Sequence, residues 1–130
     1  SQPFIHHFTL HNWSTGTAVR VKGLVDDGAM VNVMDAELWP KVRHRLTAVQ
    51  PSTRRLRMAN GTIVPSQGKW TGIFDFNGVR VENTFEVFPS KGAWSFLIGK
   101  PLLEALRACH DYHADTITVR NQQQTAVLRN

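Results

Sequence analysis

Alternation of apolar and polar residues dominates the first part of the chain. Two alternating runs, at positions 4–13 and 18–25, are separated by Ser14-Thr15-Gly16-Thr17, residue types that favour a turn. An apolar residue at every second position gives a strand one face that can pack against a core. We therefore predict a β-hairpin whose second strand leads directly into Asp26.

Two Asn-Gly dipeptides, Asn60-Gly61 and Asn77-Gly78, indicate two further hairpins. Both residue types tolerate a positive φ, which tight hairpin turns require. Residues that favour strands flank these turns and recur near the end of the chain. We expect strands at 55–59, 69–76, 79–88 and 116–119. The Gln-rich end from residue 122 is polar enough to be a tail or an added edge strand.

Two short segments favour helices. Residues 35–42 are compatible with a brief helix that Asp35 caps and that Pro40 keeps short. At 102–108, leucines recur at helical spacing just after Pro101, a residue type suited to a first helical turn. The balance of elements predicts an all-β fold with little helix.

Length and composition narrow the organisation of the chain. A chain of 130 residues can form one domain with its own core, and we expect a single domain at 1–130. Cys109 is the only cysteine, so an intramolecular disulfide is excluded and the cytoplasm or nucleus is the expected compartment. The most apolar stretch, at 94–99, is too short to cross a membrane.

The net charge of +5 is unevenly distributed. Between positions 41 and 57 every charged residue is basic: Lys41, Arg43, Arg45, Arg54, Arg55 and Arg57. Such a segment carries a positive field. It is compatible with a solvated surface or with a weak contact to nucleic acid or an acidic partner.

The segment Leu24-Val25-Asp26-Asp27-Gly28-Ala29 carries the chemistry of most interest. Its apolar start is typical of a buried strand, and Gly28 permits a sharp turn immediately after it. An acidic side chain is thereby held at the end of a rigid element in apolar surroundings, where it is suited to proton transfer. Taken alone, the segment is more typical of a simple or calcium-binding turn.

The order of motifs along the chain resembles that of retropepsin-like aspartic proteases, most closely the protease domains of fungal long-terminal-repeat retrotransposons. The resemblance spans roughly 18–119. It implies that Asp26 is the catalytic aspartate and that Asp27, Gly28 and Ala29 complete the active-site loop. It assigns a mobile flap to Met58, Ala59, Asn60, Gly61 and Thr62. Phe96-Leu97-Ile98-Gly99-Lys100 matches the motif that braces the active-site loop.

This resemblance also implies a fold and an activity. The fold would be a closed acid-protease barrel with a flap hairpin and one short C-terminal helix. Two copies would form a homodimer with the two Asp26 side chains facing across a two-fold axis, and the dimer would cleave peptide bonds of a polyprotein without a metal or cofactor. The alternative is an inactive or domesticated module of the same fold that dimerises or binds peptides.

Asp27 departs from the family pattern, which has Thr or Ser after the catalytic aspartate. The hydroxyl both donates and accepts hydrogen bonds across the axis, whereas an ionised carboxylate only accepts them. A protonated Asp27, or one that accepts an N–H from the other loop, would still join the two loops. Adjacent side chains on an extended segment point to opposite sides, and motif order assigns the catalytic role to Asp26.

Substrate contacts are expected in the segment 91–94, where the resemblance places Ala93 and Trp94 in the lining of side-chain pockets. Packing of Trp94 into the core is the other interpretation. Two histidine groups, His6-His7 with His11 and Cys109-His110 with His113, lack a four-ligand metal motif, so we expect no metal site. No Gly-x-Ser-x-Gly sequence is present, which argues against a serine hydrolase.

Overall fold

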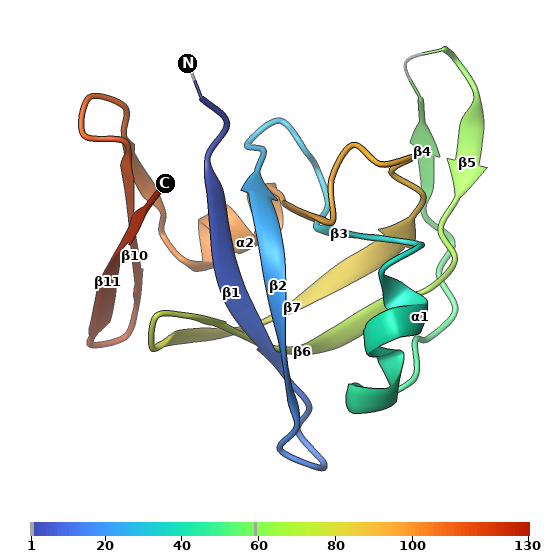
Figure 1. Cartoon of the computed structure of the whole chain (residues 1–130), viewed down its shortest axis with the longest axis horizontal. Helices are drawn as coiled ribbons and strands as arrows, with labels where there is room; N and C mark the ends of the chain where they lie inside the picture. The colour runs from blue at the N-terminus through green and yellow to red at the C-terminus, as the bar shows by residue number, and fades with distance from the viewer. Residues whose placement is uncertain (1, 59) are drawn as a thin grey trace.

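The computed structural model describes residues 2–58 and 60–130, and strands dominate these residues (Figure 1). Six strands close a barrel, in the spatial order β1 (Ile5–His11), β2 (Ala18–Val25), β8 (Phe96–Ile98), β3 (Val33–Asp35), β7 (Val79–Phe88) and β6 (Lys69–Phe76). A separate hairpin and a separate three-stranded sheet comprise β4 (Arg55–Arg57), β5 (Ile63–Pro65), β9 (Cys109–Asp111), β10 (Thr116–Asn121) and β11 (Gln124–Arg129). The helical segments are α1 (Trp39–Val42), the 3-10 helix η1 (Arg43–Arg45) and α2 (Lys100–Ala105).

Two long hairpins form most of the barrel wall. β1 pairs with β2 from Ile5↔Leu24 to His11↔Ala18, as the alternating pattern predicts. β6 pairs with β7 up to a turn at Asn77 and Gly78, whose φ values of 53° and 95° explain the choice of Asn-Gly. Both hairpin predictions are therefore confirmed.

Aromatic rings fill the barrel. The Phe85 ring packs against two others, with its centroid 5.3 Å from that of Trp70 and 5.6 Å from that of Phe96. Phe8 stacks on Phe76 at 4.8 Å. These five side chains are almost completely buried, so dense packing holds the ends of the strands, and the loops that leave them, in fixed positions.

A parallel pairing within the barrel determines where the candidate site forms. β2 and β8 run side by side in the same direction, with Gly23 opposite Phe96 and Val25 opposite Ile98. Both strands consequently end at the same edge of the barrel. The segments that follow them, 26–32 and 99–100, meet there.

The prediction of a helix at 35–42 is wrong in its first half. Asp35 is the last residue of β3, and its buried carboxylate accepts a hydrogen bond from the Ser90 N–H at 3.0 Å instead of capping a helix. α1 begins only at Trp39, with Pro40 in its first turn, where the missing N–H costs nothing.

The C-terminal part of the chain agrees in type with the prediction and differs in its bounds. α2 begins two residues earlier than the predicted 102 because Pro101 lies within its first turn, and it ends before Arg107, whose φ is 47°. The Gln-rich end forms the added edge strand β11, which pairs with β10 from Thr116↔Arg129 onwards. The strand β9 was not predicted from the sequence.

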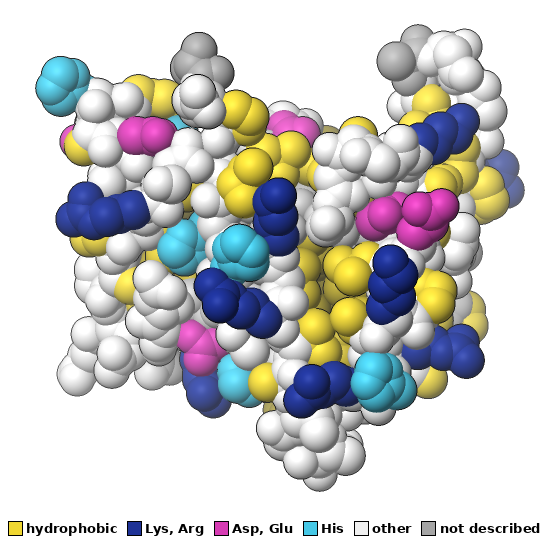
Figure 2. Space-filling model, in the orientation of Figure 1, with side chains coloured by type: hydrophobic (Ala, Val, Ile, Leu, Met, Phe, Trp, Pro, Cys, Tyr) yellow, Lys and Arg dark blue, Asp and Glu magenta, His cyan; other side chains and the backbone are white. Residues whose placement is uncertain are grey.

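The basic segment is distributed over separate elements of the fold. Lys41, Arg43 and Arg45 lie on α1 and η1, whereas Arg55 and Arg57 lie on β4, and all five are exposed. Figure 2 likewise shows Lys and Arg side chains scattered over one face. The contact with nucleic acid remains a prediction. Within the described ranges, no helix is long and apolar enough to cross a membrane.

Candidate active site

Asp26 is the first residue after β2 and begins the Asp26 loop, residues 26–32. Its backbone N–H donates to the carbonyl oxygen of Ile98 at 2.9 Å, which attaches the loop to β8. Its carboxylate oxygen Oδ1 accepts a hydrogen bond from the Gly28 N–H at 3.0 Å. The carboxylate is half-buried, so it is oriented by the turn and remains accessible at the end of the barrel.

Gly99 and the residue after it support the Asp26 loop through hydrogen bonds. Its N–H donates to Oδ1 of Asn32 at 2.9 Å, and the N–H of Lys100 donates to the Ala29 carbonyl oxygen at 2.8 Å. A Cβ atom at position 99 would lie against the carbonyl oxygen of Val31 and 2.9 Å from that of Ala29. Only glycine lets the two backbone segments pass this closely.

Asn32 completes the brace. It is almost completely buried, and its Nδ2 donates to Oδ1 of Asn83 and to the carbonyl oxygen of Thr84, each at 2.9 Å. Both ends of its side-chain amide are thus satisfied, as a buried polar group requires. Asn32 joins the Asp26 loop to β7, and we find it to be a structural part of the site that the sequence interpretation missed.

Asp27 and Asp26 open onto a hollow of about 420 Å³, which we call the Asp27 hollow. Its walls are polar on the side of the loop and aromatic on the side of β9. The lining residues are Gln2, Phe4, Val25, Asp26, Asp27, His110, Tyr112 and Asp115.

The predicted flap is the tip of the hairpin formed by β4 and β5, which projects from the same end of the barrel as the Asp26 loop (Figure 1). The Met58 N–H donates to the Thr62 carbonyl oxygen at 2.7 Å, and the Gly61 N–H donates to the Met58 carbonyl oxygen at 2.9 Å. Gly61 has a φ of +86°, as the Asn60-Gly61 pattern predicts. Ala59, also predicted to lie in the flap, is outside the described residues.

An apolar cluster connects the flap hairpin to the Asp26 loop. Its buried members are Val31, Val33 and Phe88, and its half-buried members are Leu56, Val64, Trp94 and Leu97. These residues come from the loop, β3, β7, both flap strands and the segment around β8. The inner face of the hairpin therefore rests on an apolar floor that begins beside the loop.

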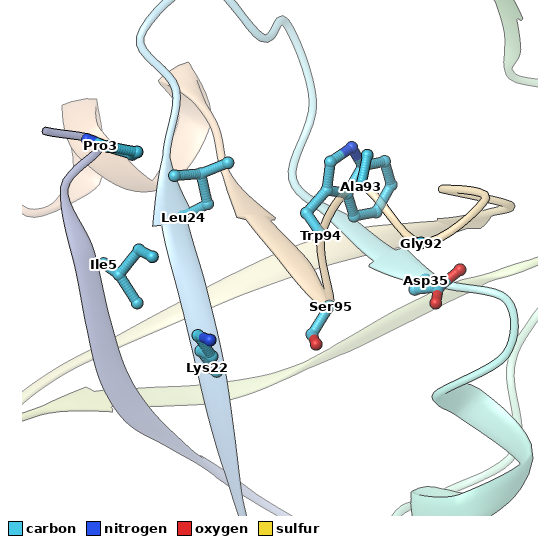
Figure 3. A pocket seen from close by; sticks show the side chains of 9 residues that line it. All are labelled: Pro3, Ile5, Lys22, Leu24, Asp35, Gly92, Ala93, Trp94 and Ser95. Carbon is cyan, nitrogen blue, oxygen red and sulfur yellow. The ribbon is translucent and has the colours of Figure 1, made fainter.

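Ala93 and Trp94 line a hollow of about 340 Å³ together with Leu24 and Asp35 (Figure 3). Figure 3 shows the Trp94 ring beside Ala93, rising from the segment that precedes β8. Trp94 also packs on the apolar cluster, so it combines both interpretations of the sequence, pocket wall and packing residue. Of the described residues that line this hollow, none belongs to the Asp26 loop.

Within the part of the chain that the structure describes, no three histidine, cysteine, aspartate or glutamate side chains are grouped so that they could hold a metal ion.

No protein-family model matches the chain. Among solved structures, the retroviral protease-like domain of Ddi1 from Leishmania major is similar, with a TM-score of 0.70, 16% sequence identity, and coverage of 99% of this chain and 93% of that chain. The chain has the retropepsin-like fold. A retropepsin-like aspartic protease from Rickettsia conorii matches with a TM-score of 0.52, 18% identity, and coverage of 98% and 92%. The predicted all-β acid-protease barrel is thus confirmed, while the kinship with retrotransposons stays a prediction.

Within this retropepsin-like fold, the predicted site residues occupy one end of the barrel but not one cavity. Asp26 and Asp27 line one hollow, and Ala93 and Trp94 another. Met58, Asn60 and Thr62 line a third hollow beneath the flap. The described part of the chain therefore has three separate hollows at this end, and one of them is lined by the Asp26 loop.

Proposed function

We propose that the protein is an aspartic endopeptidase whose active site forms when two copies bring their Asp26 carboxyls together. The observation that carries the proposal is the support of Asp26, whose carboxylate accepts the Gly28 N–H while Asn32 and Gly99 hold the loop in place. A carboxylate held so firmly at an accessible edge is prepared for proton transfer. One chain supplies a single such group, so the dimer is required for the pair.

The chemistry follows from two carboxyls that share one proton, because two negative charges so close together are unfavourable. The ionised carboxylate accepts a proton from water as the water oxygen bonds to the carbonyl carbon of the substrate. The protonated carboxyl donates its proton to the carbonyl oxygen. The carboxyl that took the proton from water then passes it to the amide nitrogen of the resulting diol. One diol hydroxyl gives its proton to the other carboxylate as the C–N bond breaks, so an acid and an amine leave and the pair again shares one proton.

The substrate is expected to be an extended peptide that the flap covers. The apolar floor formed by Val31, Leu56 and Val64 favours apolar side chains there. The order of the sequence motifs favours a polyprotein that contains this domain as the natural substrate. It also favours a retrotransposon as the origin of the domain.

The second candidate is a module with the same fold that dimerises or binds peptides without cleaving them. Asp27, in the place of Thr or Ser, favours this alternative because an ionised carboxylate cannot donate across the axis. The support around Asp26 favours the enzyme, since a binding module has no need of an oriented carboxylate.

A digest of a peptide library, with products identified by mass spectrometry, separates the two candidates. We expect cleavage whose rate per chain rises with protein concentration, in step with dimer formation measured by sedimentation equilibrium. A dimer that binds library peptides without cleaving them would establish the alternative instead.

Gly61→Val should lower peptidase activity at least about tenfold, because valine at a φ of +86° disturbs the flap tip that closes over the substrate. Gly16→Val is a matched control, since Gly16 also has a positive φ, of +71°, and open space around it, in a turn between β1 and β2. Both variants should lose about 1 kcal/mol of unfolding free energy. Equal activity of the two variants in a peptide-cleavage assay would show that the flap tip is a static surface turn.

A further inference from the structure

The side chains of Asp27 and His110 line the same hollow although they come from distant parts of the chain. Asp27 is exposed, and its carboxylate makes no hydrogen bond or salt bridge with the other residues that the structure describes. A carboxylate at this position carries its charge to the place where a second copy is expected. Some group must compensate that charge if two copies are to meet there.

The His110 ring is held in place by aromatic neighbours. Tyr112 stacks on it with ring centroids 3.9 Å apart, and Phe4 meets it edge to face at 5.4 Å. Its Nε2 atom is buried without a hydrogen-bond partner among residues 2–58 and 60–130. A fixed imidazole with an unused polar atom lines the same hollow as a carboxylate without a partner, and the single chain leaves the two unpaired.

The other acidic groups around the hollow already have partners. Asp26 accepts the Gly28 N–H, and Asp115 accepts a hydrogen bond from Asn130 Nδ2 at 3.0 Å. Asp111, next to His110 in β9, accepts the N–H groups of His113 and Ala114. Asp27 is thus the carboxylate best able to turn towards His110.

We propose that His110, as an imidazolium, is a positioning residue that neutralises Asp27 across this hollow when a second copy covers it. This inference rests on the proposed dimeric peptidase. In that dimer the His110–Asp27 pair is present twice, once in each copy, and compensates the charge that Asp27 brings in the place of Thr or Ser. Tyr112, which is 74% exposed, supplies apolar surface that the second copy buries.

A double-mutant cycle on the dimer dissociation constant tests the pairing. The parent, Asp27→Thr, His110→Gln and the double variant are compared by sedimentation equilibrium at about pH 5.5 and about pH 8.5, on either side of the range in which imidazoles usually lose their proton. At the lower pH, His110→Gln should weaken the parent dimer about tenfold and the Asp27→Thr dimer less than about twofold. At the higher pH, the two effects should become equal.

Two further variants separate charge from packing. His110→Phe keeps the aromatic contacts with Tyr112 and Phe4 and removes the charge, so it should weaken the dimer as much as His110→Gln does. His113→Gln, on the turn beyond β9 and outside the lining of the hollow, should leave the dissociation constant unchanged.

The outcomes also distinguish this inference from the function on which it rests. If the parent is dimeric and active, but His110→Gln changes the dissociation constant equally with Asp27 and with Thr at position 27, the pairing alone is overturned. If the His110→Phe dimer is as stable as the parent dimer, His110 acts through packing and not through charge, and the pairing is also overturned. A parent that stays monomeric and cleaves no peptide would overturn the peptidase and the pairing together.

Discussion

Asp26→Asn is expected to reduce peptide cleavage by about a thousandfold while leaving the free energy of unfolding nearly unchanged. An asparagine amide can neither accept the proton from the attacking water nor share a proton with its twin in the second copy. Its Oδ1 can still accept the hydrogen bond that the Gly28 N–H makes at 3.0 Å, so the turn is preserved. The Asp26→Asn variant should therefore cleave peptides far more slowly than the parent while its unfolding transition stays the same.

Asp111→Asn is the matched control for that variant. Asp111 also accepts an N–H from the residue two positions further on, at 3.0 Å, and it lies outside the lining of the Asp27 hollow. The same chemical change in the same kind of turn should leave cleavage unaffected. Rates are compared at one protein concentration at which sedimentation shows the dimer. An Asp26→Asn protein that cleaves as fast as the parent would remove Asp26 from the mechanism.

Gly99→Ala should lower the free energy of unfolding by about 3 kcal/mol and abolish peptidase activity. The added Cβ would lie 2.8 Å from the carbonyl carbon of Val31 and 2.9 Å from the carbonyl oxygen of Ala29. These are backbone atoms that cannot rotate aside, so the loop or α2 must shift. Any residue can adopt the φ of −93° found at Gly99, so the expected loss of stability comes from crowding alone.

Gly28→Ala provides the comparison for stability. A Cβ there would meet only Oδ1 of Asp26, at 3.4 Å, an ordinary contact distance, so the loss should stay below about 1 kcal/mol. Urea denaturation of both variants measures the difference. If Gly99→Ala is as stable as Gly28→Ala, the Asp26 loop and the segment beyond β8 do not pass each other as closely as described.

The hairpins of the barrel could be predicted from the sequence because their determinants are local. Alternating residues specify β1 and β2, and Asn77-Gly78 specifies the turn between β6 and β7. The capping role predicted for Asp35 failed for the opposite reason. The carboxylate of Asp35 accepts a hydrogen bond from the Ser90 N–H, 55 positions away, and no local sequence pattern predicts this contact.

The candidate site likewise has a part that local sequence predicts and a part that depends on distant residues. Asp26 and Gly28 could be assigned from one short motif, because the turn that they form is contained in it. Asn32 stands out in sequence only as a polar residue between Val31 and Val33, and its partner Asn83 is 51 positions away. A buried amide that joins distant segments can be suspected from such an interruption, but its partner emerges only from the fold.

The parallel pairing of β2 with β8 has a consequence for the order of folding. The Asp26 loop lies early in the chain, yet its supports come from Ile98 and from Gly99, which is 67 positions away from Asn32. Contacts between such distant segments form late, because a long loop must close first. During synthesis the barrel cannot close until β8 has left the ribosome. The nascent chain thus carries Asp26 while the segments that will support its loop are still to be synthesised.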